Sequence, residues 1–302
     1  MQTERPSPRY SAIDLWQPAE ILDSMIEGQF AAIAAVHAAR PALERAAAAI
    51  EERLAAGGRL VYAGAGTSGR LAVQDGAELM PTFSWPAERL VLLMAGGQGA
   101  LLRAVEGAED DAEEAEALVR RHRIGGGDAL IAVAASGTTP FTLACLRAAS
   151  AAGALTVAIA NNRSTPLLDE AAHPILLDTG AEPIAGSTRM KAGTAQRAAL
   201  TVLSSLVMIR LGGVYAGLMV DVQATNDKLV RRSERILQQL TGHGRDEVRE
   251  ALRAARGSIK TALLLLEGHD LAEAKAALAA ASGNLRAAQD IIGKRHGNRK
   301  RA

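Results

Sequence analysis

Glycines and hydroxyl side chains cluster in one short segment of the sequence, "RLVYAGAGTSGRL". Gly64, Gly66 and Gly69 have the G-x-G-x-x-G spacing of a dinucleotide-binding loop between a strand and a helix. Such a site also needs an acidic residue at the end of the second strand, to hold a ribose hydroxyl. The second predicted strand ends in "LLMAGGQGA", which has no acid. Backbone N–H groups at a helix start bind anions in general. Because Thr67 and Ser68 add hydroxyl donors, the loop favours a phosphate ester over a dinucleotide.

A second loop, "AASGTTPF", carries the same chemistry after a later predicted strand. Ser136, Thr138 and Thr139 surround Gly137, and Pro140 stands where a helix would begin. Taken alone, these hydroxyls are equally explained by ordinary helix capping. Two such loops, after two strands of one sheet, favour a compact phosphate monoester as the ligand.

Carboxylates near these loops are candidates for acid–base chemistry. The segment "QDGAELMPTF" holds Asp75 and Glu78, and the acidic stretch "EGAEDDAEEAE" begins with Glu106. Most of that stretch is best explained as a solvated helical face. Glu106 differs because it comes first, close to the loop after the second strand. Two carboxylates in different environments can divide into an acid and a base.

A third polar segment, "EPIAGSTRMKAGTAQ", precedes an apolar helix. Ser187 and Thr188 come before the predicted helix, and Arg189 and Lys191 fall in its predicted first turn. Cations are unfavourable at a helix N-terminus. Their presence indicates an anionic partner, either the same phosphate or a neighbouring acid, although simple surface ion pairs remain an alternative.

Other chemistry finds little support. Cys145 lies on the apolar side of a predicted helix and cannot form an internal disulfide, which favours a reducing compartment. The six histidines are scattered without metal-ligand spacing, so we expect no metal. The formal net charge of +1 gives no argument for nucleic acid. The first ten residues lack a signal-peptide core, and "AALTVLSSLVMI" is too short to span a bilayer. These features predict a soluble, cytoplasmic protein without a membrane partner.

The elements that must position these residues alternate along the middle of the chain. Continuous apolar runs occur at "RLVYAG", "RLVLLM", "ALIAVAA", "ALTVAIA" and "PILLDT", as expected for strands buried on both faces. Helical patterns separate them, at 69–79, 99–123, 140–152 and near 165–172. This alternation predicts a parallel sheet with helices on both sides, and ligands bind beyond the carboxyl ends of such strands.

Helices flank this region on both sides. Residues 18–57 predict two helices, the second beginning near Pro41. After the apolar helix "MKAGTAQRAALTVLSSLVMIRLG", 219–240 predict another helix and 245–297 about three short ones, with a basic, solvated tail. No internal repeat is convincing. We therefore expect an N-terminal helical segment (1–57), a phosphosugar-binding α/β domain (58–225) and a C-terminal helical region with a small three-helix bundle (226–302).

Together these motifs resemble the N-acetylmuramic acid 6-phosphate etherase family, within the wider group of sugar isomerase (SIS) domains. The resemblance is carried by "GAGTSGRLAVQDGAELMPTF", "AVEGAEDD", "AASGTTPF", "GSTRMKAGTAQ" and "LMVDVQATNDKL", and runs from "TERPSP" to about residue 240. It implies an αβα sandwich with a five-stranded parallel, flavodoxin-like sheet, in a homodimer with sites near the interface. It implies cleavage of the lactyl ether in cell-wall sugar recycling, without cofactors.

The resemblance also implies roles for individual residues. The family's two catalytic glutamates correspond to Glu78 and Glu106, and we assign Glu78 as the acid and Glu106 as the base. The sugar phosphate would be bound by residues of the three polar segments: Gly66, Thr67, Ser68, Ser136, Gly137, Thr138, Thr139, Ser187 and Lys191. One departure is "ELMPTF", where many members have a cysteine or methionine and a second proline after the glutamate.

Two other functions stay open on the residues alone. An aldose–ketose phosphosugar isomerase would share the phosphate loops and the base, but would not need an acid directed at a lactyl oxygen. A non-catalytic phosphosugar sensor would keep the hydroxyl loops without needing both glutamates. A helix-turn-helix regulator is less consistent with the acidic, alanine-rich residues 1–57.

Overall fold

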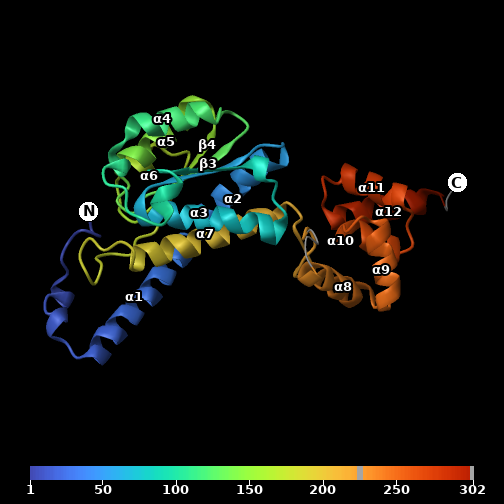
Figure 1. The fold of residues 1–302 in the computed structure, drawn as a ribbon, viewed down its shortest axis with the longest axis horizontal. Coiled ribbons are helices and arrows are strands. Elements are labelled where there is room, and N and C mark those ends of the chain that lie inside the picture. Colours follow the sequence, from blue (N-terminus) through green and yellow to red (C-terminus); the bar gives the residue numbers. More distant parts are fainter. Residues whose placement is uncertain (223–226, 300–302) are drawn as a thin grey trace. The chain divides into compact units, whose positions relative to one another are not determined.

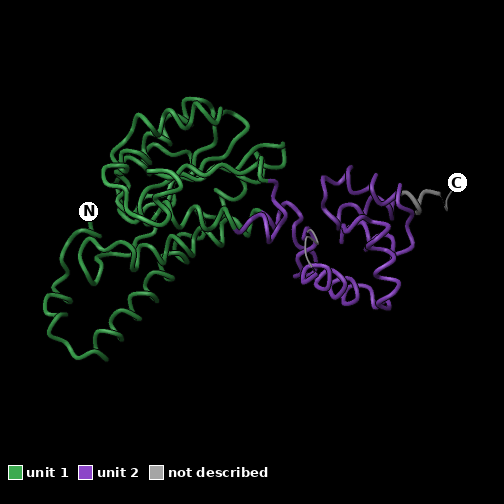
Figure 2. Tube along the Cα trace, in the orientation of Figure 1, with its two compact units in different colours: residues 1–77, 87–207 green, residues 78–86, 208–302 purple. Residues whose placement is uncertain are grey.

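The computed structural model describes residues 1–222 and 227–299 of the chain, with side chains described to residue 294. The chain divides into two compact units, shown in Figure 2: residues 1–77 with 87–207, and residues 78–86 with 208–302. The first unit holds the sheet and the second holds the C-terminal helices. The domain boundaries predicted at residues 57 and 225 stay predictions, and the second falls within the undescribed residues 223–226, which also form part of the motif "LMVDVQATNDKL".

A five-stranded, all-parallel sheet forms the centre of the first unit. Its strands pair in the order β2-β1-β3-β4-β5, with bounds β1 Leu60–Gly64, β2 Leu90–Met94, β3 Ala129–Val133, β4 Leu155–Ala160 and β5 His173–Leu176. All five runs predicted as strands are confirmed. Gly64 at the end of β1 pairs with Met94 of β2 and Val133 of β3, so the loops after these strands begin side by side at one edge of the sheet.

Helices cover both faces of the sheet, which confirms the predicted αβα sandwich (Figure 1). On one face a buried cluster packs α4, α5 and α6 against the sheet; their bounds are Ala112–Arg121, Pro140–Ala151 and Pro166–Glu170. The other face is covered by α2, α3 and α7, with bounds Arg40–Ala55, Gly66–Phe83 and Lys191–Arg210. Side chains alternate between the two faces along each strand, so that Val61 packs on the α4–α5 side and Tyr62 on the other.

The N-terminal helices begin as the sequence indicates. α1 spans Pro18–Ala38 and opens with a capping box between Gln17 and Glu20. α2 has Pro41 in its first turn, where the missing N–H of proline costs nothing. Before α1, short 3-10 turns occupy Pro8–Tyr10 and Ile13–Leu15.

The segment between β2 and α4 differs from the prediction. The sequence pattern predicts a helix over 99–123, whereas only Ala112–Arg121 is α-helical. Short 3-10 turns occupy Gln98–Leu101 and Ala108–Asp110, and another, Ala87–Arg89, precedes β2. Gly107 has a positive φ and interrupts the predicted helix, and Gly96 and Gly97, which precede it, also have positive φ. Glu106 therefore lies on an irregular loop.

α7 is a core helix. Its 20 residues make it the one helix among those described that is long and apolar enough to cross a membrane, and 56% of its most apolar window is buried in the protein. The prediction rejected a membrane span on length. Burial of residues such as Ala195, Ala199 and Leu203 is the better argument.

The second unit is a helical bundle preceded by a two-stranded hairpin. The hairpin pairs β6 (Val214–Tyr215) with β7 (Leu218–Met219). Four helices then follow α8 (Asp227–Thr241), where the prediction had about three: α9 Arg245–Ala254, α10 Ile259–Leu266, α11 Leu271–Ala280 and α12 Leu285–Arg299. Each of these helices is separated from the next by only a few residues, so the sequence pattern does not mark their ends clearly.

A short turn motif is repeated in this bundle, and the absence of a longer internal repeat stays a prediction. "ALRAARGSIKTA" joins α9 to α10 and "ALAAASGNLRAA" joins α11 to α12. Both turns use a left-handed residue followed by a left-handed glycine, at Arg256–Gly257 and Ser282–Gly283. Both following helices are capped from the side chain of the next residue: Ser258 accepts from the Thr261 amide and Asn284 from the Ala287 amide. The two turns thus share one local geometry, and each turn with the helix that follows it is here called a copy of the motif.

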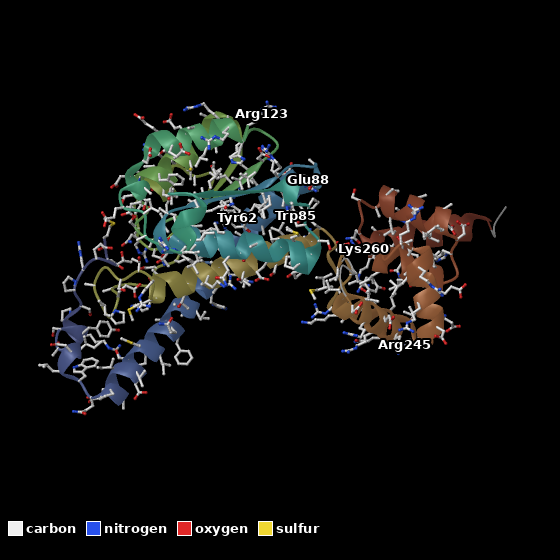
Figure 3. All side chains as sticks on the ribbon, in the orientation of Figure 1. Tyr62, Trp85, Glu88, Arg123, Arg245 and Lys260 are labelled. Carbon is white, nitrogen blue, oxygen red and sulfur yellow. The ribbon has the colours of Figure 1, made fainter. Side chains whose placement is uncertain are left out.

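One cation in each copy contacts the segment that contains the β6–β7 hairpin. Lys260, which is labelled in Figure 3, has its Nζ 2.6 Å from Asp221 Oδ1. The guanidinium of Arg286, at the matching position of the second copy, stacks over the ring of Tyr215 at 4.8 Å from its centroid. Equivalent positions of the repeat therefore hold the two ends of the same segment.

Candidate active site

Close packing explains the glycines of the loop between β1 and α3. A Cβ at Gly69 would lie 2.5 Å from Met94 Sδ and 2.6 Å from the Gly64 carbonyl oxygen, so strand and helix touch through their backbones. Gly66 has φ of +53°, a left-handed conformation that suits glycine. Because α3 begins at Gly66, the amides of Thr67 and Ser68 lie in its first turn, where N–H groups lack helical partners.

The hydroxyl residues of this loop lie at different depths. Ser68 is buried and Thr67 half-buried. Thr67 lies beside the start of α7, since a Cβ at Gly193 would be 3.7 Å from Thr67 Cγ2. The Gly193 amide in turn donates to the Thr188 carbonyl at 2.8 Å. The structure thus brings the first predicted loop together with the third.

The second loop follows β3, next to β1 in the sheet. Ser136 Oγ lies 3.2 Å from Thr139 Oγ1 and accepts a hydrogen bond from the Thr138 amide at 3.2 Å. Thr138 is exposed, with its hydroxyl 4.0 Å from Met1 Sδ, and Ser136 and Thr139 are half-buried. Gly137 has φ of +70°, and a side chain there would clash with Thr165.

A buried acid accounts for the start of α7. Both carboxylate oxygens of Glu182 accept backbone hydrogen bonds, from the amides of Lys191 (3.0 Å) and Ala192 (2.8 Å). Glu182 is fully buried. The anionic partner that the sequence indicates for this helix start is therefore, at least in part, a neighbouring acid. Arg189 is exposed and lies before the helix rather than in its first turn.

Lys191 is a buried lysine with a structural partner. Its ammonium donates to the Thr179 carbonyl at 3.0 Å, and its side chain packs on Gly28 of α1. Burial lowers the pKa of Lys191, while the negative charge of Glu182 opposes that shift. Ser187, half-buried, is held in a turn in which the Met190 amide donates to its carbonyl.

Sequence reasoning missed a buried amide network behind these loops. Asn161 and Asn162 directly follow β4 and are almost completely buried. Asn161 donates to the Leu177 carbonyl at 3.0 Å and accepts from Gln196 of α7 at 2.9 Å. Asn162 bonds to the loop after β3 and to Thr3. The "NN" pair directly after a buried strand was the available signal, because polar residues at that edge are candidates for ligand or loop contacts.

The two candidate catalytic glutamates are both exposed. Glu78 lies on α3 and belongs to the second unit, whereas Glu106 lies on the irregular loop of the first. Their roles as acid and base stay predictions. The loop of Glu106 is fixed from α3: Arg70 Nε donates to the Ala100 carbonyl at 2.9 Å, and Arg70 Nη2 to the Arg103 carbonyl at 3.3 Å.

Asp75, the other acid of the first segment, is buried and structural. Its Oδ2 accepts a 2.8 Å hydrogen bond from the Tyr62 hydroxyl. Burial raises the pKa of Asp75, against the opposing effects of hydrogen bonds from Tyr62 and Ser204. Cys145 is likewise buried, and burial raises its pKa to about 12, so it is an unreactive core thiol.

Comparison with known proteins identifies the family. The glucokinase regulatory protein N-terminal SIS domain matches residues 42–150. The chain is 53% identical to the N-acetylmuramic acid 6-phosphate etherase of Deinococcus radiodurans, over 88% of this chain and 87% of that protein. It is 44% identical to the etherase of Vibrio vulnificus (87% and 88% covered) and 43% identical to that of Streptomyces coelicolor (88% and 86%). At this identity and coverage, with an SIS-type sheet carrying hydroxyl-rich loops at its carboxyl edge, the chain belongs to the N-acetylmuramic acid 6-phosphate etherase family.

Proposed function

We propose that this chain cleaves the D-lactyl ether of N-acetylmuramic acid 6-phosphate by elimination and hydration, giving N-acetylglucosamine 6-phosphate and D-lactate. One observation carries the proposal beyond family membership. Hydroxyl-bearing loops follow the adjacent strands β1 and β3, whose ends pair at Gly64 and Val133. A phosphate monoester between them would meet backbone amides and hydroxyls from two sides.

The phosphate is the anchor in this scheme. Hydroxyls and backbone amides of Thr67 and Ser68 would bind it from the first turn of α3. Those of the loop before α5 would bind it from the other side, through Ser136, Thr138 and Thr139. Gly66 and Gly137 let the backbone turn at these points. Ser187 is proposed to bind the sugar, and Lys191 to add positive charge behind it, because its ammonium uses only one described hydrogen bond, to Thr179.

The chemistry follows from the position of the ether. The lactyl oxygen is on C3, which is β to the aldehyde of the open-chain sugar. Glu106, as the base, takes the C2 proton that the carbonyl acidifies. Glu78, as the acid, protonates the lactyl oxygen as the C3–O bond breaks. Water then adds to C3 of the unsaturated aldehyde and a proton returns to C2. The electrons move within the substrate, so the scheme requires neither a metal nor a nucleotide.

A homodimer is part of the proposal. Along α1, an apolar stripe stands half or more exposed; it is formed by Leu22, Ile26, Phe30 and Ile33. These residues recur at helical spacing on one side of the helix, and Figure 1 shows α1 extending from the sandwich. An exposed stripe of this kind is typical of an interaction surface. A second copy of the chain, covering it close to the sheet edge, is the occupant that we propose. In a cytoplasmic location the enzyme would serve recycling of cell-wall sugar.

A single assay tests the proposed reaction. Purified protein is incubated with N-acetylmuramic acid 6-phosphate in water labelled with oxygen-18, and D-lactate and the sugar product are measured. We expect lactate release, with the label on C3 of the sugar. Unlabelled C3 would exclude elimination and hydration.

The same assay separates the two alternatives. Binding of the sugar phosphate without lactate would favour the non-catalytic sensor. Interconversion of an aldose and a ketose phosphate, with the ether intact, would favour the isomerase. Either result would contradict the proposed function.

A further inference from the structure

The first residues of the chain are tied into the edge of the sheet that carries the loops. Thr3 is completely buried, although it does not belong to a helix or a strand. Its main partner is Asn162, in the loop after β4, which is 3% exposed. Such burial is unusual so near a chain end, where residues are commonly loose unless contacts hold them.

The carboxamide of Asn162 uses all of its hydrogen-bonding groups. Its Oδ1 accepts from the Gln2 amide at 2.6 Å and from the Thr3 amide at 3.3 Å. Its Nδ2 donates to Thr3 Oγ1 at 2.9 Å and to the Ala135 carbonyl at 2.8 Å. Both donors and both acceptor positions of the amide are occupied, so Asn162 joins the chain start to the loop after β3.

Thr3 also reaches the segment that precedes α7. The Gly186 amide donates to the Thr3 carbonyl at 3.0 Å. The Glu4 side chain lies against the same glycine, since a Cβ at Gly186 would be 3.0 Å from Glu4 Oε2. Residues 1–4, here called the N-terminal strap, thus connect three segments that are far apart in the sequence.

Each connection ends next to a residue of the proposed site. Ala135 directly precedes Ser136, and its carbonyl accepts from both Asn162 Nδ2 and the Asn161 amide. Gly186 directly precedes Ser187. Two hydrogen bonds on the Ala135 carbonyl fix the plane of the peptide that joins Ala135 to Ser136. The hydrogen bond from the Gly186 amide to the Thr3 carbonyl likewise fixes the plane of the peptide that precedes Gly186.

We propose that Thr3 and Asn162 are positioning residues of the sugar-phosphate site, which hold Ser136 and Ser187 at the separation that the substrate requires. This inference rests on the proposed function, in which both serines bind the sugar phosphate. Neither Thr3 nor Asn162 contacts the substrate in this role; they act through the loops.

The test compares two substitutions that each remove one buried threonine hydroxyl. Thr3→Val removes the bond that Thr3 Oγ1 accepts from Asn162 and the 3.5 Å bond that it donates to Glu4 Oε1. Thr156→Val removes a bond of the same kind at the opposite end of β4, where Thr156 Oγ1 accepts from the Ala172 amide at 3.1 Å and is 2% exposed. The dissociation constant of N-acetylglucosamine 6-phosphate, KM, kcat and Tm are measured for both, and Thr3→Ser serves as the conservative rescue.

We expect Thr3→Val to raise the dissociation constant and KM about tenfold, the size of effect that the loss of one buried hydrogen bond has, with kcat changed less than twofold. Thr3→Ser should restore binding. Thr156→Val should lower Tm about as much as Thr3→Val does, but should leave binding unchanged. The proposal would be overturned if Thr3→Val bound the sugar phosphate as tightly as the wild type does. It would also be overturned if Thr156→Val weakened binding as much as Thr3→Val.

Ser136→Ala distinguishes this inference from the proposed function. If Ser136→Ala weakens binding and Thr3→Val does not, only the positioning role is wrong. If the wild type binds the sugar phosphate and Ser136→Ala binds it equally well, the proposed site itself is wrong, and the positioning role fails with it.

Discussion

The hydroxyl of Tyr62, in the middle of β1, donates a 2.8 Å hydrogen bond to the carboxylate of Asp75 on α3. Both residues are buried (Tyr62 is labelled in Figure 3), and the pair joins the sheet to the helix that also carries Glu78. Burial raises the pKa of Asp75 and raises that of Tyr62 well above its usual value. The folded protein therefore binds a proton at Asp75 more readily than the unfolded chain does.

Replacing Tyr62 tests this pair. In the wild type, the free energy of unfolding falls as the pH rises from about 4 through the raised pKa of Asp75. The reason is that the folded state keeps the Asp75 proton to a higher pH than the unfolded state does. Tyr62→Phe removes a donor to the charged form, so the pKa of Asp75 should rise further. We expect a loss of about 1–2 kcal/mol at pH 8 and a smaller loss at pH 5, measured by urea unfolding. Tyr10→Phe is the control, and a loss independent of pH would contradict the account.

Replacing the two glutamates separates the acid from the base. Glu78→Gln and Glu106→Gln should each abolish lactate release, because one step of the elimination lacks its proton carrier. Glu78→Gln should still exchange the C2 proton of the substrate with deuterated solvent, whereas Glu106→Gln should not. Exchange is followed by NMR, and the far-ultraviolet circular dichroism of both variants should match the wild type. The reverse exchange pattern would interchange the two roles.

Arg70 should act on catalysis through the loop of Glu106. Arg70→Met removes its hydrogen bonds to the carbonyls of Ala100 and Arg103. We expect kcat to fall about 10- to 100-fold, the effect of displacing a reacting group by about 1 Å, while KM changes little. Arg120→Met, which removes an exposed ion pair with Glu116, is the matched control. Unchanged kcat in Arg70→Met would show that the loop holds its shape without this side chain.

Lys260 should stabilise the second unit through Asp221. Burial raises the pKa of Asp221, and the charge of Lys260 opposes the shift. Lys260→Met leaves the carboxylate without its cation and should cost about 2 kcal/mol at pH 7, less than a fully buried pair because Asp221 is partly exposed. Adding Asp221→Asn should recover part of this loss. Urea unfolding measures both, and a double variant as unstable as the single would count against a pairwise effect.

Much of the first unit was predictable because its signals are local. Continuous apolar runs separated by helical patterns predicted five parallel strands, and all five are present. The glycines of the first loop were also informative, since only glycine fits where the backbones of Gly64 and Gly69 approach. Family membership, carried by the same motifs, is confirmed by the relatives.

The irregular loop of Glu106 was not predictable in the same way. Its acidic, alanine-containing sequence has good helical propensity, and the positive-φ glycines that break it are visible only as single residues. The network around Thr3 and Asn162 was missed for a different reason. It joins residues that are far apart in the sequence, and the asparagine pair after β4 indicates a polar site without indicating which residues it contacts.

The helices of the two copies of the turn motif differ in how deeply they are buried. α10 packs against α8, α9 and α11 and is the central helix of the bundle, with Leu263 and Leu264 buried. The matching residues of α12 are Gln289 and Asp290, and Asp290 is exposed. If the second copy were to occupy the central position, Asp290 would lose its hydration inside an apolar core, at a high cost in free energy. Leu263 and Leu264 thus suit α10 to the centre of the bundle, whereas the polar residues at the matching positions suit α12 to its surface, although both helices follow the same kind of turn.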